Sequence, residues 1–242
     1  MSTSKIEWTE KTWNPITGCS KVSEGCKNCY AENLANRLRA MGAKKYSNGF
    51  QITTHEDSLF EPLYWKHSST VFVCSMSDLF HESIPYSFID RIMDVIEQTP
   101  QHRYQVLTKR AERMADYFLS RKVPQNVWTG VTVENIAAKQ RIDVLRSICS
   151  PLRFLSCEPL LGDLGILDLK GIHWVIVGGE SGTSARKIEK VWVQNIMRQC
   201  EEQEVSFFFK QWGTWGEDGR KRNKKANGKT IDGKVYQKMP EI

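Results

Sequence analysis

Residues 71–107 read VFVCSMSDLFHESIPYSFIDRIMDVIEQTPQHRYQVL, and this stretch decides the fold. It opens and closes on short apolar runs, Val71–Cys74 and Tyr104–Leu107, whose β-branched and aromatic residues are typical of buried strands. Between these runs, residues 86–98 place four apolar side chains on one helical face, those of Ile89, Ile92, Met93 and Ile96. The stretch therefore predicts a strand, a helix and a second strand parallel to the first.

The same alternation continues on both sides of this unit. Further strands are expected at residues 13–16, 127–131, 152–155, 174–177 and 206–209, and further helices at 31–41, 111–120, 136–148 and 191–203. The strands are almost continuously apolar, which indicates that both faces of the sheet are covered. We expect an α/β fold, a partial or complete TIM-type (β/α) barrel, with a doubly wound open sheet as the alternative.

Length and composition fit one large globular domain. The chain has 242 residues, of which 40% are hydrophobic and 26% are charged. Its apolar runs are far shorter than a membrane span, and the N-terminus lacks the apolar core of a signal segment. Seven cysteines, an odd number, argue against a disulfide framework and favour a reducing compartment. We therefore expect a cytoplasmic protein without a membrane segment, in which Cys74, Cys149 and Cys200 are buried structural thiols.

The positive charge is concentrated near the C-terminus. Residues 219–238 carry eight Lys or Arg and one Asp, a net charge of +7, so the overall charge of +6 leaves about −1 for the rest of the chain. We expect a barrel domain over residues 1–218 and a basic tail over 219–242. Such a tail can bind the phosphates of a nucleic acid, and Trp192, Trp212 and Trp215 add aromatic surface before it. The alternatives are a solvated, partly disordered end and a hydrophobic clasp formed by the tryptophans.

Three cysteines near the N-terminus, Cys19, Cys26 and Cys29, have the spacing C-x6-C-x2-C. Three thiolates are one too few for a closed zinc site, which takes four ligands. They suit a cubane iron–sulfur cluster with one iron left open, and an iron–sulfur cluster is the favoured interpretation. Zinc with a distant fourth ligand is the alternative. His81 is the best-placed histidine, as a general acid or base or as that fourth ligand.

Polar residues follow every predicted strand of the series. In a barrel or an open α/β sheet, ligands bind at the carboxyl ends of the strands. Thr132, Asn135 and Ser181 in these positions are explained equally well as helix caps, and the glycines as a tight turn. The strand-end residues that we expect to bind a cofactor are Ser75, Ser77, Lys109, Glu134, Glu158, Gly178, Gly179, Glu180 and Lys210.

Several segments in order carry a resemblance to a known family. These are Glu7–Thr9, Thr12–Pro15, Ser75–Phe80, Leu107–Arg110, Ser156–Leu160, Gly178–Gly182 and Phe207–Gly213, within about residues 6–215. They resemble a family first catalogued among phage and prophage genes. That family is similar to radical SAM enzymes and, more loosely, to the spore photoproduct lyase branch. The common radical SAM signature is C-x3-C-x2-C, so the first gap is longer here.

The resemblance implies a cysteine loop that holds a [4Fe–4S] cluster, with S-adenosylmethionine (SAM) chelated to its open iron. An external electron donor would reduce the cluster, and SAM would be cleaved to methionine and a 5′-deoxyadenosyl radical that acts on a substrate. A nucleic-acid base or nucleotide is the substrate class that the basic tail, the aromatic C-terminus and the family favour. A peptide or another protein is equally compatible with a barrel mouth. The contrasting hypothesis is a non-catalytic, zinc-stabilised module that binds nucleic acid or protein.

Overall fold

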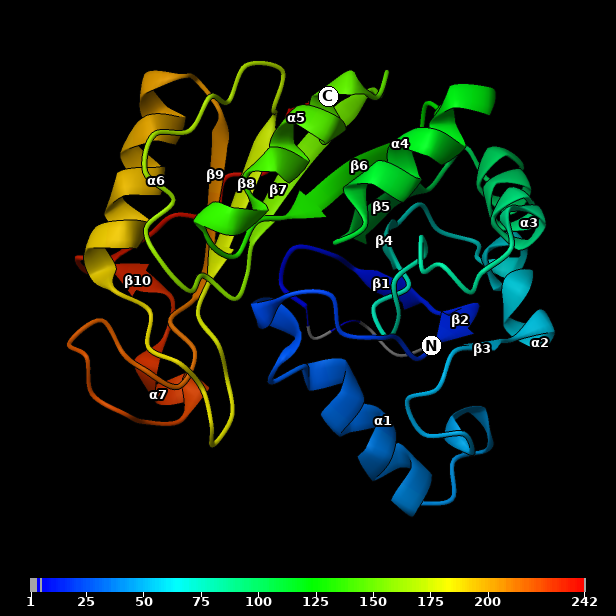
Figure 1. The fold of residues 1–242 in the computed structure, drawn as a ribbon, viewed down its shortest axis with the longest axis horizontal. Coiled ribbons are helices and arrows are strands. Elements are labelled where there is room, and N and C mark those ends of the chain that lie inside the picture. The colour runs from blue at the N-terminus through cyan, green and yellow to red at the C-terminus, as the bar shows by residue number, and fades with distance from the viewer. Residues whose placement is uncertain (1–3, 5, 242) are drawn as a thin grey trace. The chain divides into compact units, whose positions relative to one another are not determined.

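A seven-stranded sheet in the order β1-β4-β5-β6-β7-β8-β9 carries the fold in the computed structural model, which describes residue 4 and residues 6–241 (Figure 1). The strands are β1 Lys11–Trp13, β4 Thr70–Val73, β5 Arg103–Thr108, β6 Val127–Thr132, β7 Leu152–Cys157, β8 Trp174–Gly178 and β9 Ser206–Gln211. Their order follows the chain without the reversal that defines a doubly wound sheet. A complete TIM barrel has eight strands, so the expected fold is confirmed in its partial form.

The five predicted helices are present, and two four-residue helices that the sequence does not predict are additional. They are α1 Tyr30–Ala40, α2 Glu56–Leu59, α3 Tyr86–Glu97, α4 Ala111–Ser120, α5 Gln140–Ser147, α6 Lys190–Glu202 and α7 Lys224–Asn227. The helix expected over 136–148 is divided into a 3₁₀ turn, Ile136–Ala138, and α5. Such turns are common at the N-termini of helices. No described helix is both long enough and apolar enough to cross a membrane. Residues 1–3 and 5, on which the expectation of no signal segment partly rests, lie outside the described residues.

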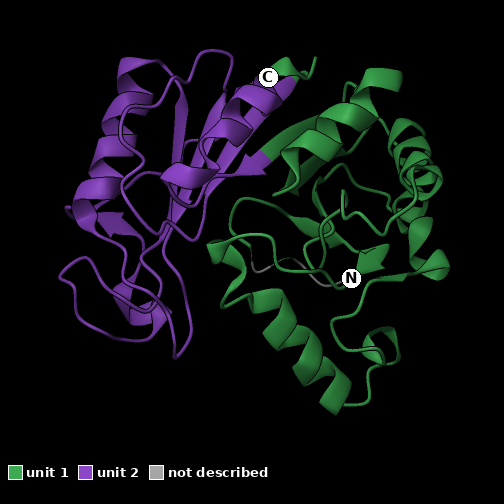
Figure 2. Cartoon of the chain, viewed as in Figure 1, with its two compact units in different colours: residues 1–130, 147–151 green, residues 131–146, 152–242 purple. Residues whose placement is uncertain are grey.

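The chain divides into two compact units (Figure 2). Unit 1 comprises residues 1–130 and 147–151, and unit 2 comprises residues 131–146 and 152–242. In unit 1, β1 pairs in parallel with β4, and β4 with β5. The predicted apolar face of α3 is confirmed, because Ile89, Ile92, Met93 and Ile96 are all buried. Trp13 and Tyr104 are fully buried, with ring centroids 5.8 Å apart.

The single strand expected at Trp13–Ile16 is wrong. The first sheet strand ends at Trp13, and Ile16–Thr17 (β2) instead pairs antiparallel with Thr53–Thr54 (β3). Proline has no N–H to donate to a sheet, so Pro15 interrupts the strand. The Asn14 side-chain oxygen accepts hydrogen bonds from the Ser75 hydroxyl at 3.2 Å and from the Met76 amide at 3.0 Å. These two hydrogen bonds hold the turn at Asn14 against the residues that follow β4.

In unit 2, β8 pairs in parallel with β7 and with β9. Trp174 of β8 is fully buried between Phe154 and Phe208, with ring centroids 5.7 and 5.8 Å away. Its indole N–H donates to the Lys238 carbonyl oxygen at 3.1 Å. A residue of the basic segment thus completes the core of this unit.

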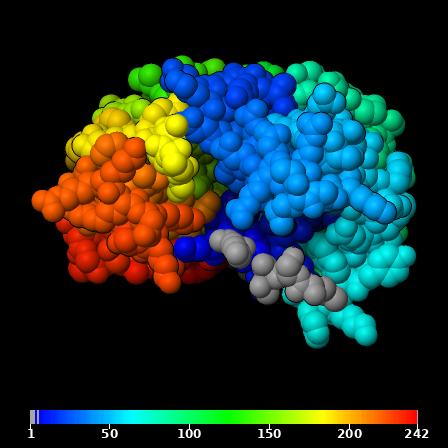
Figure 3. Space-filling model, turned by 90° about the horizontal axis from the view of Figure 1, so that it is seen from below, coloured from blue at the N-terminus to red at the C-terminus, as the bar shows by residue number. Residues whose placement is uncertain are grey.

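The basic segment folds rather than remaining a loose end over residues 219–241. It contains α7 and a hairpin of β10 Thr230–Ile231 and β11 Lys234–Val235. The Asn223 side chain caps α7 by accepting from the Ala226 amide at 2.9 Å. Trp212 is buried and donates to the Thr230 carbonyl oxygen at 2.7 Å, as a clasp requires. The segment therefore has folded elements, while most of its side chains are exposed, as a solvated end requires; it is drawn orange to red in Figure 3.

The cysteines outside the loop divide into two classes. Cys74 and Cys200 are buried, as predicted, and so is Cys157. Cys149 is exposed, so the prediction that it is buried is wrong. It lies in the connection between α5 and β7, just before Pro151, and not in an element that faces the core.

Candidate metal and cofactor site

The cysteine loop begins at Gly18, in unit 1, and its first residues are fixed by the chain around them. The Gly18 amide donates to the Met76 carbonyl oxygen at 3.0 Å, and its own carbonyl oxygen accepts from the Ser77 hydroxyl at 2.6 Å. Gly18 has a φ of +86°, and a Cβ at this position would come within 2.2 Å of the Gln51 carbonyl oxygen. Only glycine satisfies both constraints. The first cysteine therefore follows a rigid connection to the end of β4.

The other two cysteines lie at the ends of helical turns. Cys26 closes a 3₁₀ turn, Glu24–Cys26, and Cys29 immediately precedes α1. Cys29 packs against a small core that contains Ala35 and Met76. The Tyr30 hydroxyl donates to the Ser75 carbonyl oxygen at 2.5 Å, and this contact holds the start of α1 against the residues that follow β4. All three loop cysteines are half-buried free thiols.

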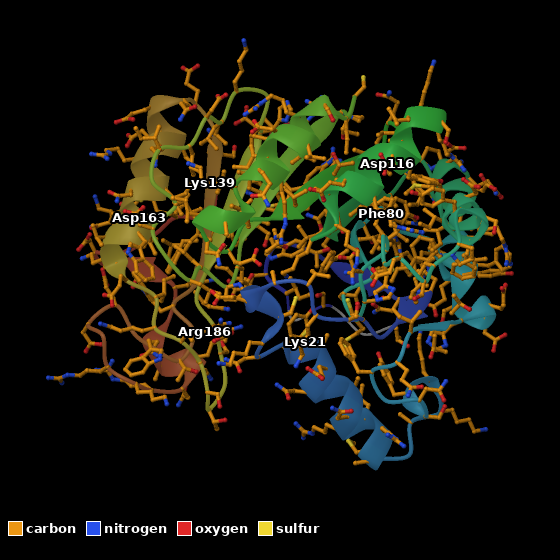
Figure 4. All side chains as sticks on the ribbon, viewed as in Figure 1. Lys21, Phe80, Asp116, Lys139, Asp163 and Arg186 are labelled. Atoms are coloured by element: carbon orange, nitrogen blue, oxygen red, sulfur yellow. The ribbon has the colours of Figure 1, made fainter. Side chains whose placement is uncertain are left out.

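Lys21, in the same loop and labelled in Figure 4, forms an ion pair of 3.0 Å with Glu32 of α1. The Lys21 side chain is more than half exposed, so this pair contributes little stability. The contacts that fix the loop are therefore the part-buried hydrogen bonds to the residues that follow β4 and β5.

Arg110 is the main polar neighbour of the loop. Its guanidinium is buried and donates to the Cys19 sulfur at 3.6 Å, to the Asp78 carboxylate at 3.2 Å and to the Glu82 carboxylate at 2.7 Å. It also donates to the Ser20 hydroxyl at 2.9 Å and to the Ser20 carbonyl oxygen at 3.3 Å. One side chain from the end of β5 thus contacts the loop and both acidic residues that follow β4.

Asp78 connects the ends of two strands. Its carboxylate accepts from the Phe80 amide at 3.0 Å, the Thr108 hydroxyl at 2.7 Å and the Lys109 amide at 3.1 Å, in addition to Arg110. A buried carboxylate needs such partners, because burial without them carries a large desolvation cost. Asp78 therefore fixes the backbone from which the Lys109 and Arg110 side chains reach the loop.

The environments of Cys19 and Cys26 differ. Burial raises the pKa of the Cys19 thiol to about 11; the Asp78 charge adds to this effect and Arg110 opposes it. Burial also acts to raise the pKa of Cys26, but the Lys109 ammonium and hydrogen bonds from the Val22 and Ser23 backbone outweigh it, and the pKa is lowered. Cys26 is thus the more readily ionised of the two, and the thiolate is the form that binds a metal.

His81 lies beside the loop with both ring nitrogens engaged. Its Nε2 is 2.8 Å from the Ser20 hydroxyl, and its Nδ1 accepts from the Ser83 amide at 3.1 Å. A neutral His81 therefore carries its proton on Nε2 and donates it to Ser20. Burial and the nearby Arg110 lower the pKa of His81, which favours the neutral form. The contacts described here make His81 a support of the loop.

The donor set fits an iron–sulfur cluster in its chemistry. Three free thiols on one loop are half-buried, one has a lowered pKa, and two cationic residues, Lys109 and Arg110, offset negative charge. Among the described residues, no three His, Cys, Asp or Glu side chains are grouped so that they could hold one metal ion. The three sulfurs of the loop are therefore not yet arranged around a common centre. Metal binding commonly completes the folding of such loops.

Ser75 and Ser77, two of the predicted cofactor-binding residues, contact the loop and its supports. Ser75 donates to Asn14, and Ser77 donates to the Gly18 carbonyl oxygen. Asn14 was not among the predicted residues, because no local pattern distinguishes it from an ordinary turn residue. Arg110 closes the Leu107–Arg110 segment but is not among the predicted candidates, although its position directly after Lys109 is a usable signal.

Unit 2 contains a second polar group, centred on Glu158. The Glu158 carboxylate accepts from Lys210 at 2.8 and 3.0 Å and from the Gln211 side chain at 3.1 Å. A Cβ on Gly178 would come 3.2 Å from the Glu158 side chain, so Gly178 gives this carboxylate its space. Three predicted residues, Glu158, Gly178 and Lys210, therefore come together here.

Glu134 is completely buried in the same unit. One carboxylate oxygen accepts from Arg141 at 2.8 Å, and the other has no hydrogen-bond partner among the described residues. Arg141 lies within a predicted helix, where an arginine gives no sign of such a contact. An unpaired buried oxygen is costly and calls for a partner such as a water, an ion or a ligand.

Chain packing explains Gly179 of the Gly178–Gly182 segment. A Cβ on Gly179 would come within 1.9 Å of the Trp212 carbonyl oxygen, and one on Gly213 within 2.2 Å of the Glu180 carbonyl oxygen. Two stretches of chain thus approach each other more closely than a side chain would allow. Glu180 is buried and forms an ion pair of 2.6 Å with Arg186, which is labelled in Figure 4. Cofactor binding by Gly179 and Glu180 stays a prediction.

Comparison with known proteins places the sequence in a family. The chain belongs to the family described as Protein of unknown function (DUF5131), whose model matches residues 3–240. No curated protein matches the sequence.

Two solved structures illustrate its structural similarity. Spore photoproduct lyase complexed with dinucleoside spore photoproduct matches with a TM-score of 0.46 and 12% identity over 83% of this chain and 63% of that one. A double mutant of spore photoproduct lyase with bound AdoMet and dinucleoside spore photoproduct matches with a TM-score of 0.43 and 13% identity over the same shares. The chain therefore spans 63% of the length of these proteins. Neither similarity assigns a role to any residue here.

Substitution of Gly18 tests the rigid connection of the loop. Gly18→Ala should lower the midpoint of thermal unfolding more than Gly42→Ala, by the equivalent of about 1 kcal/mol or more. Both glycines have positive φ, but a Cβ on Gly42 meets nothing within 4 Å, so the difference isolates the contact with the Phe50 and Gln51 backbone. Equal midpoints, measured by circular dichroism, would contradict the close approach.

Alkylation of the metal-free protein tests the two thiol environments. At pH 8, iodoacetamide should modify Cys26 faster than Cys19, because the thiolate is the nucleophile and only Cys26 has a lowered pKa. Lys109→Gln should slow the reaction of Cys26, whereas Lys21→Gln should not. Peptide mass spectrometry over time measures both rates. Faster modification of Cys19 would show that the assigned environments are reversed.

Proposed function

We propose that this member of the DUF5131 family is a radical SAM-type iron–sulfur enzyme. Cys19, Cys26 and Cys29 would hold a [4Fe–4S] cluster. When bound, such a cluster supplies an open iron for SAM and the electron that cleaves it to methionine and a 5′-deoxyadenosyl radical. The observation that carries the proposal is the loop itself, where three half-buried free thiols follow a rigid connection to β4 and lie beside Arg110 and Lys109.

The charges of unit 1 support this assignment. Three thiolates on one loop concentrate negative charge, and an uncompensated concentration of that kind is unfavourable in a half-buried site. Arg110 donates to Cys19, and Lys109 lowers the pKa of Cys26, so each of these two sulfurs has its own cationic neighbour. The Asp78 carboxylate accepts from the backbone amide of Lys109 and from the guanidinium of Arg110. It therefore fixes the Lys109 backbone and orients the Arg110 side chain.

The remaining predicted residues enter the proposal as SAM contacts. SAM carries a carboxylate, an ammonium group and two ribose hydroxyls. In unit 1, Ser75 and Ser77 would contribute hydroxyl oxygens as acceptors, because their O–H groups already donate to the loop and its supports, and Lys109 would contribute an ammonium donor. In unit 2, Glu134 and Glu158 offer carboxylate oxygens, Lys210 an ammonium donor, and Gly178, Gly179 and Glu180 backbone and carboxylate groups.

We extend the proposal to a nucleic-acid base or nucleotide as substrate, with an external electron donor as partner. Seven side chains of the basic segment are exposed cations: Arg220, Lys221, Arg222, Lys224, Lys225, Lys234 and Lys238. Because the segment is folded, these charges are held on a surface that can contact a phosphate backbone. Lys221 also lies 5.5 Å from the centre of the Trp215 ring. The seven free cysteines suit a reducing compartment, and we propose the cytoplasm.

Reconstitution with iron and sulfide under anaerobic conditions tests the cluster. The wild-type chain should turn brown, with broad absorbance near about 400 nm, and should form 5′-deoxyadenosine when dithionite and SAM are added. Cys26→Ala should lose most of the bound iron and all of the product. Cys149→Ala is the matched control, because Cys149 is exposed and outside the loop, and it should retain both. A colourless chain that holds one zinc ion would contradict the proposal and favour a zinc-stabilised module.

Charge substitutions in the basic segment test nucleic-acid binding. Lys224→Gln combined with Lys225→Gln should weaken the binding of a short fluorescein-labelled single-stranded DNA. The slope of log affinity against log salt should fall by about 0.7 for each phosphate that the variant no longer neutralises. A control pair, Lys44→Gln with Lys66→Gln, removes the same charge from exposed positions of unit 1. Equal affinity and slope in both double variants, measured by fluorescence anisotropy, would exclude the basic segment as the binding surface.

A further inference from the structure

Arg110 uses its whole hydrogen-bonding capacity within unit 1. A guanidinium has five N–H donors and no acceptor. Nε donates to Glu82, Nη1 to Asp78 and the Cys19 sulfur, and Nη2 to the carbonyl and hydroxyl oxygens of Ser20. The five contacts match the five donors. The Cys19 sulfur is therefore one of the partners for which this buried side chain is positioned.

The surrounding carboxylates do not account for that contact. The Asp78 side chain is 9% exposed and already accepts from Phe80, Thr108 and Lys109. The Glu82 side chain is 60% exposed and requires no buried partner. Ion pairing with these two groups orients the guanidinium, and the orientation leaves one Nη1 donor directed at the sulfur. A role confined to charge balance would not require this last contact.

We infer that Arg110 is a positioning residue for the proposed cluster, which orients Cys19 and raises the reduction potential of the centre it ligates. This inference rests on the proposed function. A hydrogen bond to a ligating sulfur, together with the positive charge of its donor, stabilises the state that carries one more electron. The couple is the one-electron reduction of a 2+ cluster to 1+, the electron comes from an external reductant, and Arg110 remains protonated throughout.

The consequence for activity is specific. A radical SAM centre must accept an electron from its donor before SAM is cleaved, so the ease of that reduction determines which donors serve it. Arg110 favours the reduced state without contacting SAM or the substrate. Its removal should therefore change the potential even when the cluster is fully loaded.

Redox titration of reconstituted variants, followed by electron paramagnetic resonance, tests the inference. Arg110→Gln removes the charge, and Arg110→Lys keeps the charge but lacks the fork of donors. At a fixed reducing potential, Arg110→Gln should lower the ratio of reduced to oxidised cluster about tenfold, or about 59 mV for one electron. Arg110→Lys should recover part of this decrease. Arg121→Gln is the control, because Arg121 pairs with Asp90, Asp94 and Glu97 and not with the loop.

Iron and sulfide analysis and the thermal midpoint of the metal-free chain accompany each titration. An unchanged potential in fully loaded Arg110→Gln would overturn the inference and leave the proposed function intact. If the wild-type chain takes up no cluster, the proposed function and the inference fall together. Should Arg110→Gln fail to fold, Ser20→Ala removes the hydroxyl that accepts from Nη2 and helps to orient the guanidinium. This variant should lower the potential by a smaller amount, and an unchanged potential in it would overturn the inference.

Discussion

The Asp78 carboxylate joins the ends of β4 and β5 through four donors, and the polar structure around the cysteine loop depends on this interaction. Two of the donors, the Phe80 and Lys109 amides, belong to the backbone, so the carboxylate fixes the path of the chain after each strand. The other two, the Thr108 hydroxyl and the Arg110 guanidinium, are side chains. Since a buried carboxylate without partners is costly, these contacts form as a set. Arg110 is thereby directed at Cys19 and Ser20.

Several features of the fold could be predicted because the sequence carries them locally. The apolar face of α3 and the apolar runs of β4 and β5 recur at helical and strand spacing, and the structure has these elements within one or two residues of the predicted bounds. The prediction of a single strand over Trp13–Ile16 is wrong. The apolar Trp13 and Ile16 favour a strand, but Pro15 between them has no N–H to donate and interrupts it. The prediction that Cys149 is buried is wrong, because a lone cysteine outside a periodic pattern gives no sign of its burial. Its exposure depends on the path of the connection between α5 and β7.

The candidate site could be predicted only in part. The loop and the strand-end residues are visible as motifs, but their partners are not. Asn14 acts through contacts with residues distant in sequence, whereas Arg141 and Arg186 contact carboxylates seven and six residues away, and no spacing rule marks any of the three. The Gly178–Gly182 segment shows the converse. Its glycines suggested a ligand, and the structure supplies another reason for Gly179, the close approach of the Trp212 carbonyl oxygen.

The central claim is that three cysteine ligands leave one iron of a [4Fe–4S] cluster open to SAM. Electron paramagnetic resonance of the dithionite-reduced, reconstituted chain tests this claim most directly, with and without SAM. We expect the signal of a reduced [4Fe–4S] cluster whose g values shift when SAM is added, because SAM binds the open iron. A reduced cluster whose spectrum is unchanged at saturating SAM, or a chain that yields no cluster signal, would contradict the claim.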